Sequence, residues 1–331
     1  MVLGMLAQVG SKHLHLPGIV LLLLSGILFG PDGLNWIKPD SLGPGLHILV
    51  GFAVAIILFE GGMNLRISRI MRERNAIRGL ITIGALCTLI GGTLITIIFL
   101  GWDFRTSILF GTLIIVTGPT VITPLLKRIR VHHGVSTILE AEGILLDAIG
   151  AIIAVVALEI AISPSGLSFV KGFYHIISRL AIGGILGVTG GFLLTVLFRF
   201  RTLIPNGLEN VFILSWVIAL FQISNTISPE SGIAAVTIAG MTIGNSKTYI
   251  QQDLLEFKEQ LTVLMIGMLF ILLSADVRIE QIYNLGYPGL LAVVLLIMVV
   301  RPISVFIGTK HSGLNLNQKL LLSWIAPRGI V

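Results

Sequence analysis

The sequence has few charged residues and almost no cysteine. Asp, Glu, Lys and Arg together make up 11% of its 331 residues, whereas about 25% is typical of soluble domains. So few charges cannot cover the surface of a soluble protein of this size, and a disordered chain needs a still more polar composition. Cys87 is the only cysteine, which excludes an intrachain disulfide and a cysteine metal cluster.

Hydrophobic residues take the place of the missing charges. They make up 55% of the chain, and the mean hydropathy is +0.99. Because a helix needs roughly 20 apolar residues to cross a bilayer, we predict an all-α polytopic membrane protein with about 11–12 transmembrane segments. The apolar stretches lie at 2–9, 16–30, 45–64, 79–101, 106–126, 138–162, 174–198, 208–226, 230–244, 261–277, 287–309 and 320–331.

Basic residues gather on one side of this predicted topology. If the loop at 66–78 is cytoplasmic, alternation of the segments places most Lys and Arg residues on that side, including those of 127–133. This is the positive-inside bias of membrane proteins. The net charge of +6 then reflects cytoplasmic loops. We therefore expect a multi-pass protein of the cell membrane, in contact with lipid and without a nucleic-acid partner.

The first and last apolar stretches are shorter than complete spans. The stretch 2–9 is too short to cross a bilayer, and the stretch 320–331 stops partway along a helix. We expect from this that the chain is a fragment of a longer protein.

Two carboxylates lie deep in one apolar segment, where ionisable residues are costly and usually functional. Glu142 and Asp147 belong to the string AEGILLDAIG. A separation of five residues turns a helix by about 140° beyond a full turn, so the two side chains point in different directions. We interpret one as the partner of a cationic side chain and the other as a group that faces a cavity. Two purely structural carboxylates are the alternative.

Two arginines are candidate partners for these carboxylates. Arg328, in the string WIAPRGIV, lies at membrane depth by its neighbours and needs a carboxylate, for which Glu142 is the best candidate by elimination. Arg301, in VVRPIS, is the other deep cation.

Other polar and small residues have more than one reading. Arg179 and Glu159 lie near segment ends, where long side chains can reach the interface. Glu60 begins EGGMNL near a segment end, and an interfacial role and a functional role are equally open. Three glycines spaced four apart predict close helix packing; these are Gly183, Gly187 and Gly191.

A helix break is predicted in the string LIIVTGPTVIT at 113–123. Gly118 and Pro119 disrupt helical hydrogen bonding in the middle of an apolar segment. Non-helical backbone at this depth is tolerated only inside protein or beside a water-filled cavity. Its carbonyls, with the hydroxyls of Thr117 and Thr120, can then coordinate a cation. Discontinuous helices of this kind mark the substrate sites of transporters.

Several strings along the chain carry a resemblance to a known family. They are LPGIVLLLLSGILFGP at 16–31, ILFEGGMNL at 57–65, TGPTVITPLLKRI at 117–129, EGILLDAIGAI at 142–152 and APRGIV at 326–331. With these strings the sequence resembles the monovalent cation/proton antiporters of the NhaP and sodium/hydrogen-exchanger type. The resemblance implies an inverted-repeat antiporter fold with a broken crossing helix, and a homodimer in the membrane.

The resemblance also implies roles for single residues. Asp147 matches the aspartate that binds cation and proton in turn, and Thr117 matches the threonine of the unwound crossing helix. Glu142 matches a glutamate paired with the arginine that Arg328 matches. Glu60 matches an acidic residue near the cytoplasmic funnel. Together with Thr120, these residues form the predicted site for Na⁺ and H⁺.

A division of the chain into two parts also follows from the resemblance. Residues 1–78 and 170–310 correspond to scaffold and dimerisation helices. Residues 79–162 and 318–331 correspond to core helices that translocate the ion. The family's second crossing helix would follow the Arg328–Gly329 pair, beyond the end of this chain.

The sequence departs from the family pattern at three places. Leu146 precedes Asp147 where the family usually has Asn or Asp, Gly118 stands where many exchangers have Asp, and Gly143 replaces a serine or a similar ligand. The first change leaves one titrating carboxylate instead of two. Electroneutral one-for-one exchange is therefore the expected stoichiometry.

The predicted function is exchange of a monovalent cation for H⁺ by alternating access. Na⁺ is the expected cation, K⁺ is the alternative, and no cofactor is needed. A gated monovalent cation channel is the rival hypothesis, and proton counter-flux discriminates the two. A membrane-embedded enzyme is disfavoured because the sequence has neither an HExxH pair nor a GxSxG elbow. A non-transporting sensor built on the same fold stays open.

Overall fold

The structure is a computed structural model, and it describes residues 1–14, 18–118, 122, 126, 131–162, 168–199, 205, 208–246 and 252–325. These residues form α-helices joined by short connections, and the described part of the chain has no strand. The helices are α1 (Val2–Leu14), α2 (Gly18–Phe29), α3 (Pro44–Asn64), α4 (Ile67–Arg72), α5 (Arg74–Gly79), α6 (Ala85–Ile95), α7 (Phe104–Ile115), α9 (His133–Ile162), α10 (Ser168–Arg199), α11 (Glu209–Ile227), α12 (Ser231–Gly244), α13 (Gln252–Asp276), α14 (Ile279–Leu295), α15 (Arg301–Gly308) and α16 (Leu316–Trp324).

Within the described ranges, six helical stretches are long and apolar enough to cross a membrane. They are Pro44–Asn64, Arg74–Leu100, His133–Ile162, Lys171–Arg199, Glu209–Ile227 and Ile279–Gly308. Two of these contain π-helical turns. Leu80–Gly84 joins α5 to α6, Thr96–Leu100 follows α6, and Leu296–Val300 joins α14 to α15. Five shorter apolar helices accompany them. The predicted all-α polytopic membrane class is therefore confirmed.

Helix α12 lies between α10 and α3 at very close range. A side chain on Gly183, Gly187 or Gly191 of α10 would collide with the backbone or side chains of α12. On the other face of α12, Gly240 and Gly244 lie directly on the backbone of α3. The glycine spacing in α10 therefore does serve close helix packing, as the sequence predicts.

The close contact between α10 and α12 predicts that a larger side chain at Gly187 destabilises the protein. A Cβ on Gly187 would lie 2.6 Å from the carbonyl oxygen of Ala235, whereas one on Gly184 would meet only the end of the Ile238 side chain, at 3.7 Å. We expect Gly187→Leu to destabilise the protein by about 1–3 kcal/mol through overpacking. Thermal unfolding in detergent measures this, with Gly184→Leu as the matched control. Equal losses from both variants would contradict the packing.

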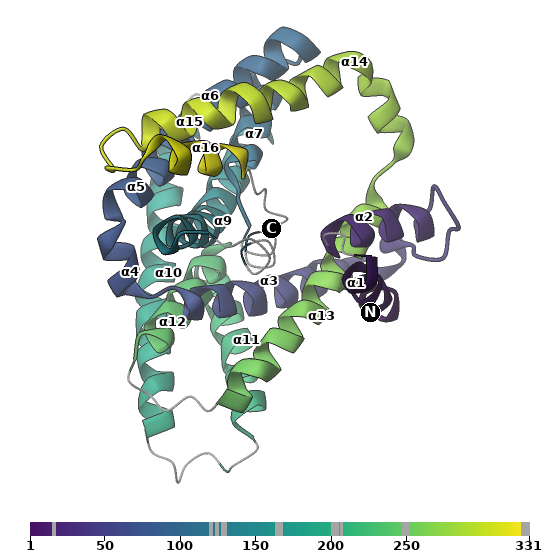
Figure 1. Ribbon diagram of the computed structural model, residues 1–331. Helices are drawn as coiled ribbons and strands as arrows, with labels where there is room; N and C mark the ends of the chain where they lie inside the picture. The colour runs from purple at the N-terminus through teal and green to yellow at the C-terminus, as the bar shows by residue number, and fades with distance from the viewer. Residues whose placement is uncertain are drawn as a thin grey trace.

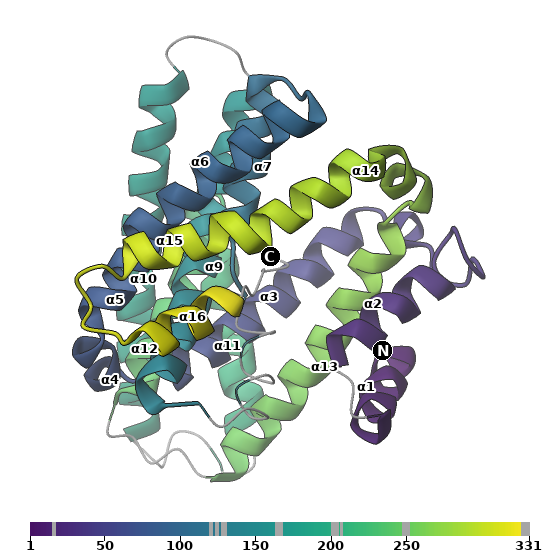
Figure 2. The same cartoon turned by 45° about the horizontal axis from the view of Figure 1, so that its top comes forward.

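The helices form two groups that flank α3 and α9. Helices α1, α2 and α13 pack together on one side, at the lower right of Figure 1. Helix α15 lies beside α5, α6 and α16 on the other side, and the view in Figure 2 keeps this arrangement. Helix α9 contacts α3, α7, α10, α12 and α16. It is therefore the central element on which a site can be assembled.

Candidate functional site

The predicted break is present at the end of α7. The helix stops at Ile115, and Val116 adopts an extended conformation with φ −60° and ψ 120°. Val116, Thr117 and Gly118 are non-helical and buried. The residue before a proline avoids the helical conformation, which accounts for the position of the break. Pro119 and Thr120 lie outside the described residues, so the role predicted for Thr120 stays a prediction.

Asp147 lies at the middle of α9 and is only 1% exposed. Gly143 and Gly150, one turn before and after it, are on nearly the same face of the helix. The missing side chain of Gly150 leaves room for the backbone of Val116, which lies 3.2 Å from the position a Cβ would take, and Gly143 faces Gly118. Asp147 therefore belongs to the helix face that packs against the broken segment.

The carboxylate of Asp147 has no hydrogen-bond partner in the described part of the chain. Both oxygens are buried. A buried charged group without a partner is strongly unfavourable, and binding a proton or a cation removes that penalty. No group of three or more His, Cys, Asp or Glu residues gathers anywhere in the described ranges. On this face of α9, Asp147 supplies a carboxylate that a proton or a cation can bind.

Glu142 forms a buried ion pair with Arg301. The Nη1 atom of Arg301 bonds to Oε1 of Glu142, and Nη2 donates to Oε2 at 3.0 Å. Nη2 also donates to the carbonyl oxygens of Leu322 and Ile325, each at 3.1 Å. These carbonyls lie at the C-terminal end of α16, where a cation satisfies orphan acceptors and the helix dipole. Arg301 thus connects α15, α9 and α16.

The sequence predicts Arg328 as the partner of Glu142, and the structure shows Arg301 bound to it. Arg301 occupies both carboxylate oxygens of Glu142. It stands directly after the π-helical turn Leu296–Val300, and such a turn changes the face that the following residues present. Arg328 itself lies outside the described residues, so its own role stays a prediction.

Thr117 joins the broken segment to α9. Its hydroxyl donates to the main-chain oxygen of Glu142 at 3.1 Å, and the residue is 1% exposed. Thr117 also lines a small polar pocket with Glu142, Arg301 and Thr88. The hydroxyl oxygen keeps its lone pairs, so the predicted role as a cation ligand is compatible with this hydrogen bond.

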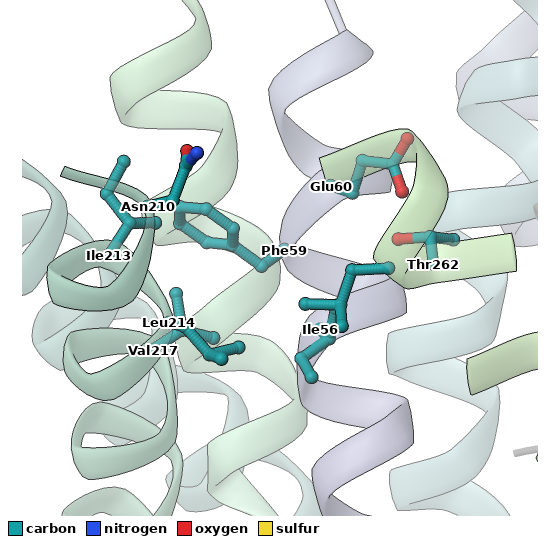
Figure 3. Close-up of a pocket in the computed structure, with 9 residues that line it drawn as sticks. Ile56, Phe59, Glu60, Asn210, Ile213, Leu214, Val217 and Thr262 are labelled. Carbon is teal, nitrogen blue, oxygen red and sulfur yellow. The ribbon is translucent and has the colours of Figure 1, made fainter. Parts of the chain in front are cut away.

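Glu60 lies in a second pocket, formed by α3, α11 and α13 (Figure 3). Asn210 of α11 and Thr262 of α13 line the same pocket. The sequence analysis did not single out these two residues. The available signal was weak, because each is a polar residue inside an otherwise apolar stretch.

Arg179 and Glu159 bind each other. Nη2 of Arg179 donates to Oε1 of Glu159 at 2.7 Å, and Arg179 is only 3% exposed. The interpretation of Arg179 as a side chain that reaches the interface is therefore wrong. This pair joins α10 to the end of α9 remote from the 66–78 segment.

The fold and the site together define a polytopic membrane protein built around a buried carboxylate and a broken helix. The chain belongs to the sodium/hydrogen exchanger transmembrane family, which it matches over residues 1–331. This is a family of transporters by its name, not of enzymes.

Two named antiporters are similar to this chain in sequence. The K⁺/H⁺ antiporter NhaP2 of Shewanella oneidensis is 28% identical over 335 residues, covering 97% of this chain and 56% of that protein. The Na⁺/H⁺ antiporter 1 of Methanocaldococcus jannaschii is 28% identical over 347 residues, covering 100% of this chain and 79% of that protein. The chain therefore spans little more than half the length of the first relative.

A solved structure confirms the fold. The sodium proton antiporter MjNhaP1 from Methanocaldococcus jannaschii, determined at pH 8, superposes with a TM-score of 0.84 at 26% identity. The match covers 99% of this chain and 81% of that chain. The predicted antiporter fold with a broken helix is thus confirmed.

Proposed function

We propose that this protein exchanges a monovalent cation for H⁺ across the cell membrane. Na⁺ is the expected cation and K⁺ is the alternative. The observation that carries the proposal is the buried carboxylate of Asp147, which lacks a described hydrogen-bond partner and belongs to the face that meets the break. The names of the relatives, Na⁺/H⁺ and K⁺/H⁺ antiporters, support it, and nothing in the comparisons favours a channel.

Competition for one carboxylate is the basis of exchange. Asp147 holds either a proton or a cation, and both loaded forms are close to neutral. A neutral site crosses the low-dielectric interior at far lower cost than an empty carboxylate. The core therefore moves when it is loaded and stalls when it is empty, which couples the two ions. Thr117, Thr120 and freed main-chain carbonyls complete the cation shell, and no cofactor takes part.

Alternating access needs two bodies that move relative to each other. We assign residues 79–162 and 318–331 to a mobile core, and residues 1–78 and 170–310 to a scaffold that also forms a homodimer. One change to this division is favoured by contacts: α14 and α15 pack on α6 and its adjoining π-helical turns, and α15 also packs on α16. We therefore assign residues 279–308 to the mobile core instead of the scaffold. The basic segments 66–78 and 127–133 face the cytoplasm in this arrangement.

Flux measurements in proteoliposomes test the proposal. An imposed Na⁺ or K⁺ gradient is expected to drive proton movement that a pH-sensitive dye reports. Because a single carboxylate carries both ions, the rate should not change when an ionophore clamps the membrane potential. Cation flux without proton counter-flux would instead support a channel, and a rate that follows the clamped potential would exclude one-for-one exchange.

A further inference from the structure

The segment 66–78 is rich in arginine and lies where two apolar spans end. It contains five arginines and one glutamate. The span Pro44–Asn64 ends just before the segment, and the span Arg74–Leu100 begins within it. All five arginines are exposed. Because the segment connects the ends of two membrane-spanning helices, it lies at the level of the lipid headgroups.

Two of these arginines hold the segment against the rest of the protein. Nη1 of Arg66 donates to the carbonyl oxygen of Gly244, at the end of α12, at 2.7 Å. Arg69 interacts electrostatically with Glu140 of α9, and α4 also contacts α9. Contacts with α9 and α12 therefore fix the position of the segment.

The other three arginines have no such partner. The side chains of Arg72, Arg74 and Arg78 form no hydrogen bond or ion pair with any residue that the structure describes. The carboxylate of Glu73 is directed toward the start of α9, where one oxygen lies 2.8 Å from the position that a Cβ on Gly134 would take. The start of a helix favours a negative charge. The three remaining positive charges are therefore available to a ligand.

A lysine from a distant part of the chain extends this group of charges. Gly308, in the last turn of α15, packs on Gly79 at the end of α5 so closely that a Cβ on Gly79 would collide with the carbonyl oxygen of Gly308. Figures 1 and 2 both show the end of α15 beside α5. Lys310 follows Gly308 by two residues, is exposed, and has no partner among the described residues. The four cationic side chains are named here the basic surface: Arg72, Arg74, Arg78 and Lys310.

Helix α4 carries exposed apolar side chains next to these charges. Ile67 and Met71 are 47% and 56% exposed, and their spacing of four residues places them on one face of the helix. Ile70 packs on a buried cluster, whereas Arg72 projects from another face. The positive-inside bias accounts for basic residues on this side of the membrane, but not for exposed apolar residues on the same short helix. An amphipathic helix of this kind lies at the boundary between headgroups and acyl chains.

We propose that the basic surface binds the headgroups of anionic phospholipids, with Ile67 and Met71 among the acyl chains of the same leaflet. Guanidinium groups donate paired hydrogen bonds to phosphate, and clusters of basic residues beside a membrane-spanning helix attract anionic lipids. Because Lys310 comes from a distant segment, the bound headgroups tie α5 to the turn that follows α15. This inference does not depend on the proposed exchange function.

Lipid binding to the purified full chain tests the proposal without a measurement of transport. The protein in a neutral detergent is titrated with phosphatidylglycerol or with phosphatidylcholine, and native mass spectrometry counts the bound lipids. We expect the protein to prefer phosphatidylglycerol. The triple variant Arg72→Gln, Arg74→Gln, Arg78→Gln should bind phosphatidylglycerol at least about tenfold more weakly, and addition of Lys310→Gln should weaken binding further. Both variants should unfold at the wild-type temperature in detergent alone, because exposed side chains without partners contribute little to stability.

Loss of three charges on the other side of the predicted topology provides the matched control. Lys38→Gln, Arg105→Gln and Lys171→Gln change exposed residues outside the basic surface, and together they should leave the preference for phosphatidylglycerol intact. Equal binding of the two lipids by the wild type, or equal losses from the two triple variants, would overturn the proposal. Displacement of phosphatidylglycerol by an equal concentration of inorganic phosphate would also overturn it, because the basic surface would then be a site for soluble anions.

Discussion

Replacement of Asp147 by Asn is expected to reduce exchange to the level of empty liposomes without harming the fold. Asparagine has the same shape but can neither release a proton nor neutralise a cation. The Asp147 carboxylate has no described hydrogen bond to lose, and removal of a buried uncompensated charge relieves a desolvation cost. The melting temperature should therefore stay equal or rise. Dye-reported proton flux and thermal unfolding in detergent measure the two effects.

A carboxylate outside the membrane segments provides the control for this prediction. Asp103 caps the start of α7, where it accepts hydrogen bonds from Thr106 and from the main chain. These bonds, the one from the Thr106 side chain above all, hold the pKa of the Asp103 carboxyl below its usual value. Asp103→Asn should leave exchange close to wild type. Pronounced exchange by Asp147→Asn would refute the central role of that residue.

Removal of Arg301 is expected to give the largest loss of stability. Arg301→Ala leaves Glu142 charged, buried and without its partner, and it also deprives the end of α16 of a donor. Breaking a buried pair by removing one member typically costs about 3–5 kcal/mol. Glu142→Gln combined with Arg301→Met removes both charges and should be less destabilising than Arg301→Ala. Chemical or thermal unfolding in detergent checks this order of stability among the wild type, the double variant and Arg301→Ala.

Two further arginines sharpen the interpretation of that experiment. Arg278, whose side chain is 41% exposed, pairs with Asp32, and Arg278→Ala should cost no more than ~1 kcal/mol, as exposed pairs do. Arg328→Ala tests the partner predicted from the sequence. Two results together would show that Glu142 does not depend on Arg301 alone. The first is that Arg328→Ala lowers the stability as much as Arg301→Ala does. The second is that the Glu142→Gln, Arg301→Met double variant is no more stable than Arg301→Ala.

Properties that depend on short stretches of chain were predictable. The expected segments 45–64, 208–226 and 230–244 agree with α3, α11 and α12 to within one residue at either end. The helix break before Pro119 and the close packing of the α10 glycines were predicted as well. Local hydrophobicity, the geometry of proline and the absence of a side chain in glycine determine these features, and each can be recognised within a few residues.

The choice of partners was not predictable in the same way. Glu142 and Arg301 are 159 positions apart, and two deep arginines were available to one glutamate. Which of them reaches α9 depends on how the helix that carries it is turned and packed. The same limit applies to Asn210 and Thr262, which are unremarkable until α11 and α13 place them beside Glu60.

The sequence by itself therefore determined that this is an α-helical membrane protein with a buried aspartate and an interrupted helix. The length of an apolar stretch, the position of a charged residue within it and the backbone properties of glycine and proline can all be read from neighbouring residues. The tertiary structure alone decided that Gly143 and Gly150 bring the Asp147 face of α9 against the break, that Arg301 pairs with Glu142, and that α3, α11 and α13 share the pocket at Glu60. These are relations between distant segments, and only the packing of whole helices sets the distances between them.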